Sequence, residues 1–127
     1  MGPPWEVWYY EDDKGQRPAE EFIDELHPKP KAKVMKFIEK FLVNVTPTEL
    51  AHGRPQIGHL RDGIYELRVV LSFHKVRLFF KTLEKHGIIL ITHGMKKYRD
   101  TIPPIEIDTA VRLCREMELR IDRGDFR

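Results

Sequence analysis

The chain has 127 residues, of which 41% are hydrophobic and 33% are charged, and its formal net charge is +2. This length fits one domain, residues 1–127, built around a single core. The composition excludes a membrane span, since no apolar run reaches the roughly 18 residues needed. The N-terminus also lacks the apolar stretch of a signal peptide, and the single cysteine excludes an internal disulfide framework. We therefore expect a cytoplasmic protein with no membrane partner.

The first half of the chain predicts a strand followed by two helices. Residues 5–10 are aromatic and β-branched, as in a strand, and from Pro18 apolar residues recur with a helical period. Two prolines within residues 27–30 predict the end of that helix, and residues 31–43 predict a second amphipathic helix. These helices would form a hairpin that packs on a sheet. Residues 44–55 contain turn-forming residues and predict a connecting loop.

The second half of the chain predicts a small sheet and a final helix. A short strand is expected over residues 56–60, a β-hairpin from residues 64–71 and 75–81, and a further strand over residues 88–93. Pro103 and Pro104 predict the start of a C-terminal helix. The order of these elements predicts an α+β fold with a mostly antiparallel sheet, an N-terminal helical hairpin and a C-terminal helix.

Positive charge is concentrated in the strand-forming segment. From Arg54 to Arg99 there are ten Lys or Arg residues against three Asp or Glu residues, so the remainder of the chain is net acidic. A sheet does not need these cations for its own stability. The asymmetry therefore indicates that one face of the sheet handles a polyanion.

Arg68 and Arg77 are the strongest candidates within this segment. If the hairpin is symmetric about its turn, the two residues lie directly opposite each other, where like charges repel. A bound phosphate, or Glu66 on the same face as Arg68, would relieve the repulsion. The alternative is a solvated basic surface with no ligand.

A second group of candidates lies where the last predicted strand ends. His93 closes that strand, and Lys96, Lys97, Tyr98 and Arg99 follow it. From this position their side chains could converge on a groove beside the arginines. The alternatives are an ordinary basic loop and a histidine bonded to a backbone carbonyl. None of the six histidines has the spacing of a metal site, so neither a metal nor another cofactor is expected.

Four segments of the chain resemble the HigB branch of the RelE/ParE toxins. The first, Leu60 to Arg68, reads Leu-Arg-Asp-Gly-Ile-Tyr-Glu-Leu-Arg; the others are 76–80, 88–94 and the Pro-Pro-Ile-Glu-Ile-Asp-Thr-Ala start of the last helix, 103–110. The resemblance implies a RelE-like fold and a toxin of a type II toxin–antitoxin pair. Many members of that family are ribosome-dependent endoribonucleases that cut mRNA, and a helix-turn-helix antitoxin would be the protein partner.

The resemblance also implies roles for individual residues. Catalysis without metal, through attack by the ribose 2′-OH, would fall to Arg68, Arg77, Lys97, His93 and Tyr98. Glu66 would orient Arg68, while Arg61, Lys75, Lys96 and Arg99 would bind RNA. The chain departs from the family pattern at Met95, where phenylalanine is frequent, and in the 96–102 segment. The assignment of proton carriers to particular lysines therefore stays open.

Two alternatives of a different class accompany this hypothesis. One is a ParE-like toxin that binds gyrase and has no nuclease chemistry, because related folds host different activities. The other is an inactive relative whose remaining role is to bind an antitoxin. Mapping of mRNA cuts would separate these alternatives from the nuclease.

Overall fold

The computed structural model describes residues 2–97 and 101–126. Its elements in chain order are β1 (Glu6–Tyr9), α1 (Pro18–Asp24), α2 (Pro28–Phe41), α3 (Pro47–His52), β2 (Ile57–His59), β3 (Tyr65–Val70), β4 (Lys75–Leu83), the 3₁₀ turn η1 (Glu84–His86), β5 (Ile88–Lys97) and α4 (Pro104–Asp122). The predicted α+β fold, with its helical hairpin and C-terminal helix, is confirmed. No helix in this part of the chain is long and apolar enough to cross a membrane.

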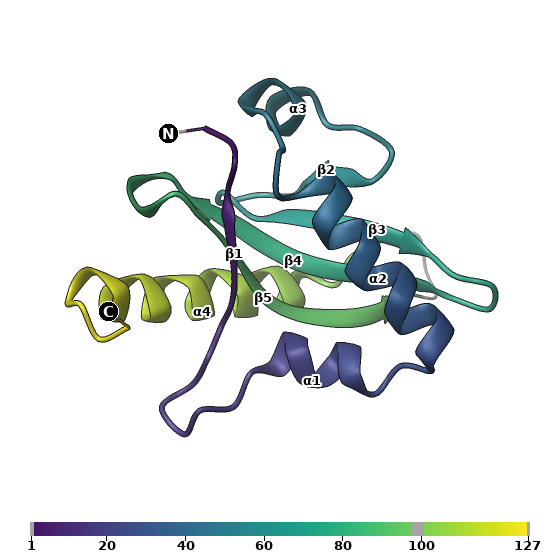
Figure 1. Cartoon of the computed structure of the whole chain (residues 1–127), viewed down its shortest axis with the longest axis horizontal. Helices are drawn as coiled ribbons and strands as arrows, with labels where there is room; N and C mark the ends of the chain where they lie inside the picture. The colour runs from purple at the N-terminus through teal and green to yellow at the C-terminus, as the bar shows by residue number, and fades with distance from the viewer. Residues whose placement is uncertain (1, 98–100, 127) are drawn as a thin grey trace.

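The strands form one mixed sheet in the order β1-β5-β4-β3-β2. The β2–β3, β3–β4 and β4–β5 pairs are antiparallel, and β1 lies parallel to β5. Helices α1 and α2 cover one face of the sheet and α4 covers the other (Figure 1). The sheet is therefore buried on both sides over most of its area.

Each face of the sheet has its own apolar core. Toward α1 and α2 the core includes Ile23, Val34 and Ile38 packed on Leu67 and Leu78 of the sheet. Toward α4 the core is formed by Ile64, Phe79, Leu83, Ile88, Leu90, Ile107, Ala110, Leu113, Cys114, Met117 and Ile121, together with Tyr10. Burial raises the pKa of the Cys114 thiol to about 12, which leaves it an inert part of the core.

Two of the predicted boundaries are wrong. Helix α2 begins at Pro28, because Pro28 and Pro30 both lie in its first turn, where a missing N–H costs nothing. Residues 47–52, which we predicted as loop, form helix α3. A capping box fixes its start: the Thr46 hydroxyl accepts a hydrogen bond from the Glu49 amide, and the Glu49 carboxylate accepts one from the Thr46 amide.

Strand β5 also extends further than predicted. It includes Lys96 and Lys97, which we had placed in an exit loop. The two lysines pair with Val76 and Lys75 of β4, respectively. Because the strand continues, the two lysines must face opposite sides of the sheet.

Candidate functional site

The two arginines predicted to face each other do so, and they share one carboxylate. Arg68 on β3 is the register partner of Arg77 on β4. Glu66 Oε1 lies 2.7 Å from Nε of Arg77 and accepts a hydrogen bond of 3.2 Å from Nε of Arg68. Glu66 thus holds both guanidinium groups and reduces the repulsion between them.

The two arginines differ in their exposure to solvent. The side chain of Arg77 is 5% exposed and that of Glu66 is 4% exposed, whereas that of Arg68 is 40% exposed. Burial lowers the pKa of Arg77, and the nearby carboxylate of Glu66 opposes that shift. Arg68 can therefore contact a ligand in solvent, while Arg77 and Glu66 lie behind it as a buried pair.

Gly58 on β2 gives Arg68 the room that it occupies. Gly58 is the register partner of Glu66, and the Arg68 side chain lies across it. A Cβ atom at position 58 would be 2.3 Å from Nη2 and 2.8 Å from Cζ of Arg68. This role of Gly58 cannot be seen in the sequence, because the contact depends on the pairing of β2 with β3.

A β-bulge sets which residues of β5 reach the site. Phe79 pairs with His93 but Phe80 pairs with Ile91, so Thr92 has no register partner on β4. The extra residue reverses the alternation that follows it. His93, Met95 and Lys97 consequently share the α4 side of the sheet.

Lys97 lies in a strongly cationic environment. Its register partner is Lys75. Burial lowers the pKa of Lys97, and Arg77, Lys75 and Arg68 lower it further, against an opposite effect of Glu66. With a lowered pKa, Lys97 loses its proton more easily than an isolated lysine does, and a general base must be in this neutral form.

His93 faces the α4 core and is 13% exposed. Its ring packs on Phe79 with ring centroids 4.8 Å apart, Nδ1 lies 3.0 Å from Thr92 Oγ1, and Nε2 lies 3.6 Å from Oε2 of Glu106 on α4. Burial lowers the pKa of His93, and Glu106 opposes the shift. The contacts that the structure assigns to this histidine are with side chains, in place of the backbone carbonyl that we considered.

The remaining predicted residues lie in different places. Nη1 of Arg61 lies 2.7 Å from Asp62, and its Nη2 lies 2.7 Å from Asp108 on α4, so this side chain ties the turn before β3 to the start of α4. Lys96 lies on the α1 side of the sheet, away from Lys97. Tyr98 and Arg99 lie outside the described residues.

A cleft of about 350 Å³ brings Arg61, Glu66, Arg68 and Lys97 together, whereas Arg77 and His93 are not among the residues that line it. It is lined by His59, Leu60, Arg61, Glu66, Arg68, Lys97, Thr101, Ile102 and Ile107. His59 directly precedes the Leu60-to-Arg68 motif but was not among the predicted site residues. The cleft places exposed cations over a buried carboxylate, an arrangement that suits an anion with several acceptor oxygens. In the described ranges, no group of three or more His, Cys, Asp or Glu residues is arranged to hold a metal ion.

A family model described as "Phage derived protein Gp49-like (DUF891)" matches residues 21–115. The matched range runs from α1 into α4 and contains the arginine pair, the bulge and Lys97. A search of the curated proteins found no match.

Proposed function

This chain belongs to the Gp49-like family of phage-derived proteins, which is associated with RelE-type toxins of toxin–antitoxin systems, and we propose that it is a HigB-like, ribosome-dependent endoribonuclease. In this proposal the protein is the toxin of a type II pair and acts in the cytoplasm on mRNA bound to the ribosome. Its protein partner is a helix-turn-helix antitoxin.

The observation that carries the proposal is a pair of like-charge contacts across neighbouring strands. Arg68 is the register partner of Arg77, and Lys75 is the register partner of Lys97. Each such pair destabilises a sheet, and Glu66 is the carboxylate that lies among them. A phosphodiester would supply the missing negative charge, so its binding would relieve the repulsion within both pairs.

The residues of the cleft fit RNA cleavage by the neighbouring ribose. In the proposed step, neutral Lys97 takes the proton of the 2′-OH, and the 2′-oxygen then attacks the adjacent phosphorus. The P–O5′ bond breaks, and the 5′-oxygen leaves with a proton; the candidate donors are Tyr98 and His93, although His93 does not line the cleft itself. The products are a 2′,3′-cyclic phosphate and a free 5′-hydroxyl, and no metal takes part.

The arginines would stabilise the charge that develops on phosphorus. Arg68 is accessible and would bind the non-bridging oxygens directly. Arg77 is buried, so its effect on the phosphate would pass through Glu66 and through its field on Lys97. Exposed Lys75 would hold the RNA backbone nearby. Arg61 lines the cleft and would contact the RNA there, while Lys96 and Arg99 remain candidates for RNA contacts outside the cleft.

An Arg68→Ala variant tests the proposal. We expect cleavage of mRNA on translating ribosomes to fall about 100-fold or more, because one donor to the developing charge is lost. Mapping of mRNA 5′ ends after addition of the purified protein measures this. The matched control is Arg123→Ala, which removes an exposed arginine beyond the C-terminal end of α4 and should cut as the parent does.

Three outcomes would contradict the proposal. Cleavage by Arg68→Ala at the rate of Arg123→Ala would remove Arg68 from the reaction. Growth arrest with intact mRNA and inhibited gyrase would favour the ParE-like alternative. Unimpaired growth with intact mRNA would favour an inactive relative that binds an antitoxin.

A further inference from the structure

Strand β1 forms one edge of the sheet and is bonded on one side. The amides of Glu6 and Tyr10 donate to the carbonyls of Gly87 and Ile91, at 3.0 and 2.8 Å, on the β5 side. Backbone groups alternate in direction along a strand, so those of Val7 and Tyr9 face away from β5. Within residues 2–97 and 101–126, no backbone hydrogen bond joins Val7 or Tyr9 to a segment beyond the sheet.

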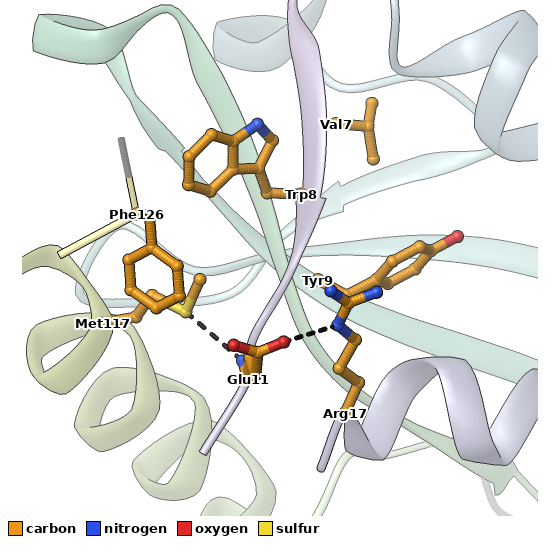
Figure 2. Close-up of a pocket in the computed structure, with 7 residues that line it drawn as sticks. All are labelled: Val7, Trp8, Tyr9, Glu11, Arg17, Met117 and Phe126. Atoms are coloured by element: carbon orange, nitrogen blue, oxygen red, sulfur yellow. Dashed lines mark hydrogen bonds and ion pairs between the residues drawn. The ribbon is translucent and has the colours of Figure 1, made fainter. Parts of the chain in front are cut away.

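A groove follows this outer edge. Its volume is about 300 Å³, and it is lined by Val7, Trp8, Tyr9, Glu11, Arg17, Met117 and Phe126. Figure 2 shows Trp8 on one side of β1 and Val7 and Tyr9 on the other. Because three consecutive residues of alternating direction line the same groove, the groove must lie over the edge of the strand, where a further strand would pair.

On the α4 side the groove is walled by apolar side chains that are held in place. The rings of Trp8 and Phe126 pack edge to face, with centroids 6.0 Å apart. Met117 is buried, and its sulfur accepts a hydrogen bond from the Glu11 amide at 3.3 Å. Apolar side chains of an added strand would therefore meet preformed contacts on the α4 side.

The groove opens into an acidic hollow at the C-terminal end of β1. This hollow, of about 300 Å³, is lined by Glu11, Gly15, Gln16, Arg17, Glu20 and Glu21, so it shares Glu11 and Arg17 with the groove. Arg17 is paired with both Glu11, at 3.0 Å, and Glu20, at 3.3 Å. Residues 6–25 contain eight Asp or Glu against two Lys or Arg. The hollow therefore keeps a negative charge after its ion pairs are counted.

We propose that the outer edge of β1 is a docking site for an extended segment of a partner protein, which adds a strand to the sheet and places Lys or Arg residues over the acidic hollow. The backbone of Val7 and Tyr9 supplies the pairing groups, the groove takes the apolar side chains, and the carboxylates select the basic end. This surface is separate from the basic cleft, which would repel such a segment. The inference goes beyond the proposed RNA cleavage and does not depend on it.

The test uses two synthetic peptides and amide hydrogen exchange. One peptide alternates valine and threonine and ends in lysines; the other is identical but ends in glutamates. In the protein alone, the amides of Val7 and Tyr9 should exchange faster than those of Glu6 and Tyr10. The lysine peptide should slow exchange at Val7 and Tyr9, and it should bind at least about 10-fold more tightly than the glutamate peptide at low salt.

Two variants distinguish strand addition from non-specific attraction. Val7→Pro removes an outward N–H and leaves the bonds to β5, so it should abolish binding while thermal unfolding stays close to that of the parent. Glu20→Lys combined with Glu21→Lys leaves the backbone N–H groups of β1 in place and makes the hollow positive. It should reverse the preference, so that the glutamate peptide binds more tightly. This second variant keeps the test valid if Val7→Pro does not fold.

Four results would overturn the proposal. These are equal binding of the two peptides, an unchanged preference in the charge-reversed variant, protection confined to the basic cleft, and protection of Val7 and Tyr9 before any peptide is added. In the last case sedimentation would identify a second copy of this chain as the occupant.

Discussion

The basic cleft and the edge of β1 belong to the same sheet but are incomplete in opposite ways. At the cleft the two strands that carry the arginines, β3 and β4, each have a hydrogen-bonded neighbour on both sides, and the side chains carry more positive charge than Glu66 can balance. At β1 the charge has the opposite sign, since Arg17 alone is paired with both Glu11 and Glu20, and the backbone of the strand has a partner on one side only. The comparison teaches that a sheet can present a binding site in two ways: through side-chain charges that the protein leaves unbalanced, or through backbone groups that it leaves without a hydrogen-bond partner.

The largest expected effect comes from removing the charge that balances the cleft. Glu66→Gln leaves buried Arg77 without a carboxylate and directly opposite Arg68, so the free energy of unfolding should fall by about 3 kcal/mol. Urea denaturation measures this. The control Glu39→Gln, at an exposed position of α2, should change little.

A double variant shows whether buried charge is the cause. Glu66→Gln combined with Arg77→Met should be more stable than Glu66→Gln alone, because no buried cation is left unpaired. If Glu66→Gln proves as stable as Glu39→Gln, the Glu66 carboxylate does not balance the charge of the arginines. The contrast drawn between the cleft and β1 would then be wrong.

Gly58→Ala should affect activity more than stability. The backbone of Gly58 tolerates alanine, but the new Cβ must displace the Arg68 guanidinium, so we expect RNA cleavage to fall about 10-fold. Gly2→Ala, where a Cβ meets no atom within 4 Å, is the control. In an Arg68→Ala background the Gly58→Ala change should have no further effect. An additive loss would mean that Gly58 acts on something other than Arg68.

Lys75→Glu should separate stability from activity. It replaces a like-charge pair with Lys97 by an opposite-charge pair, which should raise the free energy of unfolding by a few tenths of a kcal/mol. RNA cleavage should fall, because the cleft loses attraction for phosphate. The gain in stability should vanish in 1 M salt, where charges are screened within about 3 Å. Exposed Lys36→Glu on α2 is the control, and a destabilised Lys75→Glu would contradict the electrostatic account.

The smallest expected effect is a pH dependence from His93. Burial lowers the pKa of His93 in the folded state, so the unfolded chain binds the proton first as pH falls below about 6.5. Stability should therefore decline between pH 7.5 and the lowered pKa, and it should decline less in His93→Asn. Urea denaturation across that range measures the difference, and equal slopes would show that His93 does not titrate in this way.

The pairing of Arg68 with Arg77 was predictable because it depends on local geometry. A short turn fixes the register of a hairpin, so the spacing of Arg68 and Arg77 placed them opposite each other. Alternation along β3 then placed Glu66 on the same face as Arg68. The order of strands and helices was similarly accessible from turn signals and apolar periods.

Other features depend on contacts that are distant in sequence. Nothing in the run from Ile91 to His93 indicates that Thr92 is an extra residue, and that bulge is what places Lys97, in place of Lys96, on the α4 side of the sheet. The burial of Arg77 and the parallel pairing of β1 with β5 arise only when the whole sheet has assembled. Helix α3 is a different case, since its Thr46 and Glu49 capping signal was present but the neighbouring proline and glycine favoured a loop.

The parallel pairing of β1 with β5 has a consequence for the order of events during synthesis. Glu6 pairs with Ile88, so β1 leaves the ribosome long before its partner exists. At roughly 5 to 20 residues per second, the interval is about 4 to 16 seconds. The same late strand supplies Lys97. Under the proposed mechanism, a nascent chain therefore has neither a complete sheet nor the general base Lys97 until β5 has emerged. The ribosome that makes the protein is not exposed to an active form of it before then.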